Sequence, residues 1–234
     1  MWYHKLNIKA LEMSNIKENL DYLKKKVKEN CSAKEITIVA VTKFIEIDKI
    51  EEIVKFGIKD IGENKVQEAE RKFPLLQKYN IKYHMIGHLQ TNKVKKAVKL
   101  FDLIHSVDSY RLALEIDKEA KKLNKIQNIL LQVNTSREES NYGILAEQTI
   151  QLVKELALLS NITLKGLMTI APFVCEEIVL RDCFKNLKNL QDEISKQAIK
   201  GVQLKYLSMG MSNDYVIALQ EGANMIRIGS AIFR

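Results

Sequence analysis

The sequence predicts an α/β protein whose strands close into a single (β/α)8 barrel of the TIM type, with an extra helix ahead of the first strand. Three observations support this prediction. Eight segments rich in apolar and β-branched residues alternate with helical segments, which is typical of parallel strands joined by crossover helices. The chain has 234 residues, enough for one such barrel. No G-x-G-x-x-G motif follows the first strand, which disfavours the alternative of an open doubly wound sheet.

The strands are expected at short apolar segments. The first, EITIVAVTK, is apolar almost throughout, as a strand buried on both faces is. The expected strands cover residues 35–43, 58–62, 82–87, 101–106, 126–134, 162–170, 204–209 and 224–229.

The helices are expected where apolar residues recur three and four positions apart. The first helix, residues 13–27, carries Met13, Ile16, Leu20, Leu23 and Val27 on one face. The others are expected at residues 47–56, 66–76, 91–99, 109–124, 146–159, 176–197 and 213–221. Only five residues follow Gly229, so the eighth helix is missing or vestigial, and the first helix is expected to cover that side of the barrel.

Composition indicates one domain over residues 1–234. Two prolines and nine glycines leave no linker, and no apolar run approaches the roughly 18 residues of a membrane span. The N-terminus lacks the apolar stretch of a signal peptide. Three scattered cysteines, Cys31, Cys175 and Cys183, suit neither a disulfide framework nor a zinc site. We therefore expect a reduced, cytoplasmic protein without a metal or a membrane partner.

The net charge of +8 raises the question of a nucleic-acid partner. The lysines are spread over several helices and mixed with glutamates, and the aromatic residues are not interleaved with them. A stacking surface for nucleic acid requires such interleaving. A solvated lysine-rich surface is therefore the preferred interpretation, and no nucleic-acid partner is expected.

Lys43 is the main candidate at the carboxyl ends of the strands, where barrels of this type place their sites. Side chains alternate along a strand, so Val39, Val41 and Lys43 share one face. If that face points inward, the amine stands at the barrel mouth on apolar neighbours, partly desolvated and suited to attack an aldehyde. The alternative is an ordinary solvent-exposed lysine that ends a strand.

The turns after the last two strands are candidates for a phosphate site, because barrels often bind phosphate there. The segment 208–212 contains Gly210, which allows a close backbone approach, and Ser212, which is expected to cap the following helix. Gly229 and Ser230 form a second small polar turn. Ordinary turn chemistry explains either segment alone.

Arg227 shares a strand face with Gly229, so an inward face places its guanidinium in the barrel mouth, where it needs an acceptor. A structural ion pair, for instance with Glu63, is the alternative.

His84 and His88 are four apart on a strand, roughly 13 Å along it, so a shared metal is not expected and each is interpreted as a hydrogen-bonded core or mouth residue. No spacing among the acids demands catalysis; the acids considered are Asp102, Asp108, Glu138 and Glu139.

Several segments, taken together and in this order, resemble the pyridoxal phosphate homeostasis protein family. They are AVTK (40–43), GENKVQE (62–68), HMIGHLQTNK (84–93), SVDS (106–109), QVNTSREESNYG (132–143), GLMTIAP (166–172), LSMGMSNDY (207–215) and IRIGSAIF (226–233). The resemblance extends from the first strand to the last residues.

The resemblance implies a barrel like the N-terminal domain of alanine racemase that carries pyridoxal 5′-phosphate (PLP) without the second domain. Lys43 matches the Schiff-base lysine, Asn64 a residue beside the cofactor ring, and Arg227 the residue facing the pyridine nitrogen. Ser212, Gly229 and Ser230 match phosphate-binding positions. A cation at the ring nitrogen disfavours its protonation and so weakens the electron sink that racemisation needs.

The implied function is PLP, or vitamin B6, homeostasis, in which the protein buffers or delivers the cofactor, with PLP-requiring apoenzymes as partners. A monomer or weak dimer is expected. Two alternatives remain: a PLP-dependent amino-acid racemase, for which only His84 is available as a second acid or base, and a phosphate-binding barrel enzyme without aldehyde chemistry.

Overall fold

Eight parallel strands form a closed barrel in this computed structural model, which describes residues 2–31, 35–136 and 142–234. The barrel strands are β1 (Thr37–Val41), β2 (Asp60–Glu63), β3 (Lys82–Met85), β4 (Leu103–Val107), β5 (Gln127–Asn134), β7 (Ile162–Met168), β8 (Tyr206–Ser208) and β9 (Met225–Ile228). Each pairs with the next, and β9 pairs with β1 to close the ring. The predicted barrel is confirmed, and the open sheet is excluded.

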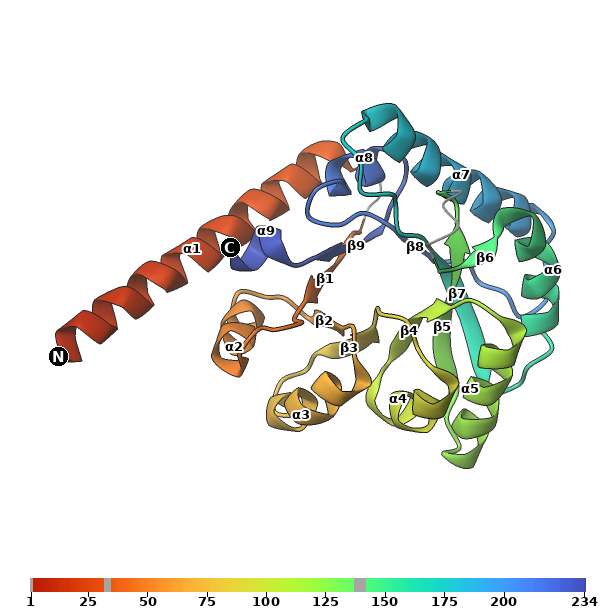
Figure 1. Cartoon of the computed structure of the whole chain (residues 1–234), viewed down its shortest axis with the longest axis horizontal. Helices are drawn as coiled ribbons and strands as arrows, with labels where there is room; N and C mark the ends of the chain where they lie inside the picture. Colours follow the sequence, from red (N-terminus) through yellow and green to blue (C-terminus); the bar gives the residue numbers. More distant parts are fainter. Residues whose placement is uncertain (1, 32–34, 137–141) are drawn as a thin grey trace.

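Helices surround the strands (Figure 1). They are α2 (Ile47–Lys55), α3 (Val66–Leu76), the 3₁₀ turn η1 (Thr91–Lys93) with α4 (Val94–Leu100), α5 (Tyr110–Lys122), α6 (Ala146–Leu156), α7 (Glu177–Lys196) and α8 (Tyr215–Gln220). The bounds of each lie within about three residues of the expected range, because the apolar stripes that define the ranges are also the faces buried against the strands.

The first and last helices cover one side of the barrel together. Helix α1 (Trp2–Asn30) is longer than expected, and Ile16, Leu20 and Leu23 on it are buried. It packs against α8 and α9 (Ser230–Phe233), the four-residue helix that follows β9. Figure 1 shows α1 running past α9. The amide of Asn19 donates to the carbonyl oxygen of Ile232 at 3.1 Å, so α1 covers the side of the barrel on which α9 lies, as expected.

One strand was not predicted. The two residues of β6 (Ile144–Leu145) pair in parallel with Val133 and Asn134 at the end of β5 and lead directly into α6. The segment lies outside the barrel ring. A two-residue strand shows no alternation along the sequence, so no pattern was available to predict it.

The core has two layers, separated by the wall of the barrel. The outer layer joins the strands to the helices and contains, for example, Ala40, Ile104 and Phe184. The inner layer fills the barrel and contains Val39, Leu103, Leu130, Met168 and Met225. Residues that pair in register with this inner layer also face inward, because neighbouring strands share the same pleat. The inner face carries polar side chains as well, and these build the site.

Candidate functional site

Lys43 lies at the carboxyl mouth of the barrel, two residues beyond the end of β1. The strand ends at Val41, and the chain then turns through Lys43 and Phe44, whose φ is 62°. Lys43 is exposed in the structure. The expectation that it is partly buried on Val39 and Val41 is therefore wrong here, because the strand ends too early for the alternation to reach Lys43.

A buried polar cluster holds the backbone just before Lys43. The ammonium of Lys72 on α3 donates to the carbonyl oxygen of Thr42 at 2.7 Å and to Glu63 Oε1 at 2.8 Å. The hydroxyl of Thr42 donates to the same Glu63 oxygen at 2.8 Å. All three side chains are at most 1% exposed. The turn that carries Lys43 is thus anchored to both β2 and α3.

Asn64 follows β2 directly and is half-buried beside this turn. Gly87, at the end of the neighbouring β3, lies against its backbone. A Cβ at Gly87 would stand 2.3 Å from the carbonyl oxygen of Asn64 and 2.8 Å from its Cα, so only glycine fits there. The close approach of the two strand ends fixes the position of Asn64 at the mouth.

The two turns predicted to bind phosphate are in direct contact. The hydroxyl oxygen of Ser212, in the segment after β8, accepts from the backbone N–H of Gly229 at 3.3 Å and of Ala231 at 3.2 Å. A Cβ on Gly229 would lie 3.4 Å from Cβ of Val41, which places this turn beside the end of β1. The serine hydroxyl of one turn and the backbone N–H groups of the other therefore meet on the side of the mouth from which Lys43 emerges.

Ser212 does not cap a helix, contrary to the sequence prediction. Helix α8 begins at Tyr215 after Asp214, whose carboxylate accepts from the backbone N–H of Met211. The segment 211–214 forms a turn before the helix, so the hydroxyl of Ser212 is directed to the neighbouring turn instead. Because α8 has six residues and α9 four, we do not assign the phosphate site to a helix dipole.

Arg227 lies inside the barrel wall, as its pairing with inner residue Val39 dictates. Its guanidinium is buried and donates to the carbonyl oxygens of Ser208 and Thr169 and to the Ser208 hydroxyl, each at 2.8 Å. Burial lowers its pKa to about 10, against the favourable charge of Asp214. The guanidinium remains protonated at neutral pH.

An ion pair between Arg227 and Glu63 was the alternative at this position, and the structure contradicts it. Glu63 pairs with Lys72, whereas Arg227 is satisfied by carbonyl and hydroxyl oxygens. Lys72 itself was missed as a site residue, although a signal exists, since it lies on the apolar stripe of α3 between Ala69 and Phe73.

The two histidines noted in the sequence lie in different places. His88 lies beyond β3, with Nδ1 3.8 Å from a carboxylate oxygen of Asp108, and its ring stacks on Tyr142 at 4.2 Å between centroids. His84 is buried inside the barrel and contacts His105, a residue that sequence reasoning did not single out. The predicted hydrogen-bonded core role is confirmed for His84, which also lines the cavity at the opposite, amino-terminal mouth, whereas His88 is a mouth residue held by the contact with Asp108 and the stacking on Tyr142. Glu138 and Glu139 lie outside the described residues.

Three further findings concern metal binding, membrane insertion and disulfides among the described residues. No three side chains among their His, Cys, Asp and Glu residues are arranged to hold a metal ion. Within the same residues, no helix has both the length and the apolar character required to cross a membrane. Cys31, Cys175 and Cys183 form no disulfide in this part of the chain.

The mouth of the barrel thus combines an exposed primary amine, two donor-bearing turns and a buried guanidinium. This fold and mouth define a barrel of the alanine racemase type, and the family model described as "Alanine racemase, N-terminal domain" matches residues 11–234. Two curated relatives named pyridoxal phosphate homeostasis protein cover most of the chain. The one from Aquifex aeolicus is 38% identical, over 88% of this chain and 87% of its own length. The one from Synechocystis is 40% identical, over 85% and 90%.

A solved structure is similar over nearly the whole chain. PipY of Synechococcus elongatus, determined with PLP bound, has a TM-score of 0.84 and 32% identity, and the match covers 94% of this chain and all of PipY. The chain therefore belongs to the pyridoxal phosphate homeostasis protein family, as the resemblance of its motifs predicted.

Proposed function

We propose that this chain binds PLP and acts in PLP homeostasis, holding and supplying the cofactor rather than turning over a substrate. The observation that carries the proposal is the contact of Ser212 with the turn at Gly229 and Ala231, which brings two sets of phosphate-binding groups to the side of the mouth where Lys43 emerges. Family membership and the PLP-bound structure of PipY support it.

The described residues fit the three functional parts of PLP. Ser212 and Ser230 would supply hydroxyl groups, and Gly229, whose own N–H already donates to Ser212, would allow a close backbone approach to a phosphate dianion. Arg227 would supply a cation to face the ring nitrogen, and its hydrogen bonds to Ser208 and Thr169 fix that cation on the barrel wall. Asn64 supplies an amide beside the ring from the end of β2.

Lys43 is the residue that we assign to covalent attachment through a Schiff base. When bound, PLP supplies an aldehyde that condenses with a lysine amine. Lys43 is exposed at the mouth, and its backbone is anchored by the buried contacts of Thr42 to Glu63 and Lys72. The amine of Lys43 is therefore accessible while the backbone before it is anchored, which suits reversible attachment and release.

The protein is expected to show little catalysis, for two reasons. The Arg227 guanidinium repels a proton from the ring nitrogen. In addition, racemisation requires an acid or base on each face of the ring, and His84, the candidate considered for the second face, donates to Asp60 and lines the cavity at the other mouth. These observations favour the homeostasis role over a racemase.

Three finer inferences belong to the same proposal. PLP-requiring apoenzymes are the expected recipients of the cofactor. A monomer or weak dimer is expected to be sufficient, since the proposed ligand groups all come from one chain. A reducing, cytoplasmic compartment is expected, since the three cysteines are scattered along the sequence and suit no disulfide framework.

Borohydride reduction tests the proposal directly. The protein is incubated with PLP, reduced, digested and analysed by peptide mass spectrometry. We expect a pyridoxyl group on Lys43 and its loss in Lys43→Ala, while Lys65→Ala, which removes an exposed lysine beside Asn64, keeps the label. Labelling on other lysines only, or equally in both variants, contradicts the assignment to Lys43, and no labelling of any lysine favours a phosphate-binding barrel without aldehyde chemistry.

The racemase alternative has a separate assay. PLP-loaded protein is incubated with L-amino acids, and the D-enantiomer is quantified by chiral chromatography. Conversion no faster than with free PLP supports the homeostasis role, whereas turnover that Lys43→Ala abolishes supports an enzyme.

A further inference from the structure

A chain of buried hydrogen bonds crosses the interior of the barrel from Arg227 to Asp60. Nη1 of Arg227 lies 2.8 Å from Ser208 Oγ, and Ser208 Oγ lies 3.1 Å from His105 Nδ1. His105 Nε2 lies 2.9 Å from His84 Nδ1, and His84 Nε2 lies 3.0 Å from Asp60 Oδ1. The first four residues are at most 4% exposed.

The strand register explains why these side chains meet. Asp60 and Arg227 both pair with Val39, from opposite sides of β1. His84 pairs with Leu103, and Ser208 pairs with Met225. Each partner belongs to the inner apolar layer, so each polar side chain also points into the barrel. The chain therefore replaces part of the apolar packing that normally fills such a barrel.

The groups at the two ends of the hydrogen-bond chain determine the direction in which protons are donated along it. A guanidinium only donates, and a carboxylate only accepts. With one proton on each imidazole, His84 donates from Nε2 to Asp60 and accepts at Nδ1 from Nε2 of His105. His105 then accepts at Nδ1 from the Ser208 hydroxyl, whose oxygen accepts from Arg227. Burial holds the pKa of His105 well below its usual range, with added repulsion from His84 and Arg227, so this imidazole is neutral.

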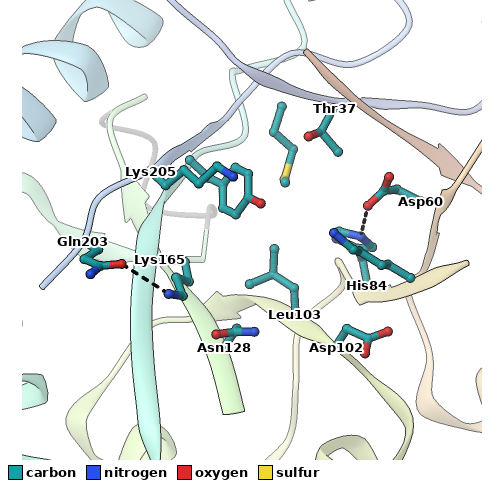
Figure 2. Close-up of a pocket in the computed structure, with 12 residues that line it drawn as sticks. Thr37, Asp60, His84, Asp102, Leu103, Asn128, Lys165, Gln203 and Lys205 are labelled. Atoms are coloured by element: carbon teal, nitrogen blue, oxygen red, sulfur yellow. Dashed lines mark hydrogen bonds and ion pairs between the residues drawn. The ribbon is translucent and has the colours of Figure 1, made fainter. Parts of the chain in front are cut away.

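The Asp60 end lies in a cavity of about 340 Å³ at the amino-terminal mouth. Figure 2 shows His84 with its ring against Asp60, and Lys165 and Lys205 on other walls of the same cavity. The side chain of Asp60 is 19% exposed, so Asp60 is the most solvent-exposed member of the hydrogen-bond chain. A carboxylate at one end of the barrel is thereby linked to a cation at the other.

We propose that Asp60, His84, His105 and Ser208 are positioning residues for Arg227, and that Asp60 sets the direction of the whole chain from the opposite mouth. This direction commits the Ser208 hydroxyl proton to His105 and presents the serine oxygen to the guanidinium. If the chain reverses, His105 donates to Ser208 from Nδ1, and the hydroxyl proton must find another acceptor beside the donors of Arg227. The effect of these residues on PLP binding rests on the proposed function, whereas the hydrogen-bond chain and its direction do not.

Histidine NMR on the cofactor-free protein tests the direction. With ¹⁵N-labelled histidine, we expect His84 and His105 of the unaltered protein to carry their proton on Nε2 only. Removing the fixed acceptor with Asp60→Ala is expected to introduce the Nδ1–H form at both rings, including His105, which does not touch Asp60. A merely structural loss at Asp60 does not predict a tautomer change at His105.

Asp102→Ala is the matched control. Asp102 lines the same cavity, but its carboxylate accepts from the backbone N–H of Tyr83 at 2.8 Å and is not part of the chain. We expect both tautomers to be unchanged in this variant. A proton on Nδ1 of either ring in the unaltered protein, or the same His105 tautomer with and without Asp60, overturns the proposal.

PLP titration separates this inference from the proposed function. We expect Asp60→Ala and Ser208→Ala to weaken PLP binding by about threefold to tenfold, the equivalent of one hydrogen bond at Arg227, and Asp102→Ala to leave it unchanged. Equal affinity in all variants overturns the positioning role. If the unaltered protein does not bind PLP, the proposed function fails, while the tautomer result still decides whether the directed chain exists.

Discussion

Replacing Lys72 by methionine is expected to destabilise the protein strongly, because the change leaves a buried carboxylate without its cation. Lys72 and Glu63 are 1% and 0% exposed, and 2.8 Å separates their charged atoms. Methionine keeps the length and helix propensity of lysine, so the main loss is electrostatic. Breaking one partner of a buried pair costs about 3–5 kcal/mol. Lys72→Met also removes the hydrogen bond that the Lys72 ammonium donates to the carbonyl oxygen of Thr42 at 2.7 Å.

Removing the whole Glu63–Lys72 ion pair is expected to cost far less stability than removing one of its two partners. Replacing both residues with apolar ones of similar volume, as in Glu63→Leu with Lys72→Met, removes the unpaired charge. We therefore expect the double variant to recover most of the lost free energy of unfolding, about 2 kcal/mol or more.

Urea unfolding followed by circular dichroism measures this free energy from the midpoint and slope of the transition. Lys78→Met is the matched control, because Lys78 forms an ion pair with Glu51 of nearly the same length, 2.7 Å, but is 62% exposed. We expect no measurable change there. A fall in the free energy of unfolding of less than about 1 kcal/mol in Lys72→Met would falsify the assignment of a buried ion pair, as would a double variant that is less stable than Lys72→Met.

Three further predictions concern backbone packing, the cofactor site and pH. Gly166→Ala is expected to abolish folding or lower the melting temperature sharply in a thermal scan, because its Cβ would stand 1.9 Å from the carbonyl oxygen of Tyr206; a normal melting curve contradicts the β7–β8 approach. Gly229→Ala is expected to keep the melting temperature, since its Cβ meets Val41 only at 3.4 Å, yet to weaken PLP binding in a fluorescence titration, and unchanged affinity argues against this turn as the phosphate site. His105 is neutral in the folded state, because burial holds its pKa well below the usual range, but binds a proton when unfolded. The free energy of unfolding should therefore fall by roughly 1 kcal/mol between pH 6.5 and 5.5, in addition to other groups, and His105→Gln should remove this part of the slope; equal slopes in both proteins contradict it.

The barrel was predictable because its signals are local. Each strand is a short apolar segment, each helix has an apolar stripe, and their alternation fixes parallel pairing. The predictions differ from the structure mainly at strand ends. The apolar residues of the first strand continue to Val41, and nothing in the sequence indicates that the turn begins directly after Thr42. The exposure of Lys43 follows from that boundary.

The candidate site was predictable only in part, because its contacts are distant in sequence. Position at the end of a strand and a resemblance to family motifs indicate Lys43, Ser212 and Gly229. The acceptors of Arg227 come from two other strands, and the contact between Ser208 and His105 spans 103 residues. The registers of several strands decide these contacts, and no spacing along the chain carries that information.

The closure of the barrel between β1 and β9 has a consequence for the order in which the molecule assembles. A ribosome delivers α1 and β1 first, yet the partners that pair with β1 on one edge and cover Ile16, Leu20 and Leu23 come from residues about 200 positions later. Until then the nascent chain exposes an unpaired edge and a bare apolar stripe. We expect the barrel to close late and cooperatively during synthesis, when β9 pairs with β1. Until that step, we expect chaperones to bind the exposed segment of α1 and β1 in preference to other parts of the chain.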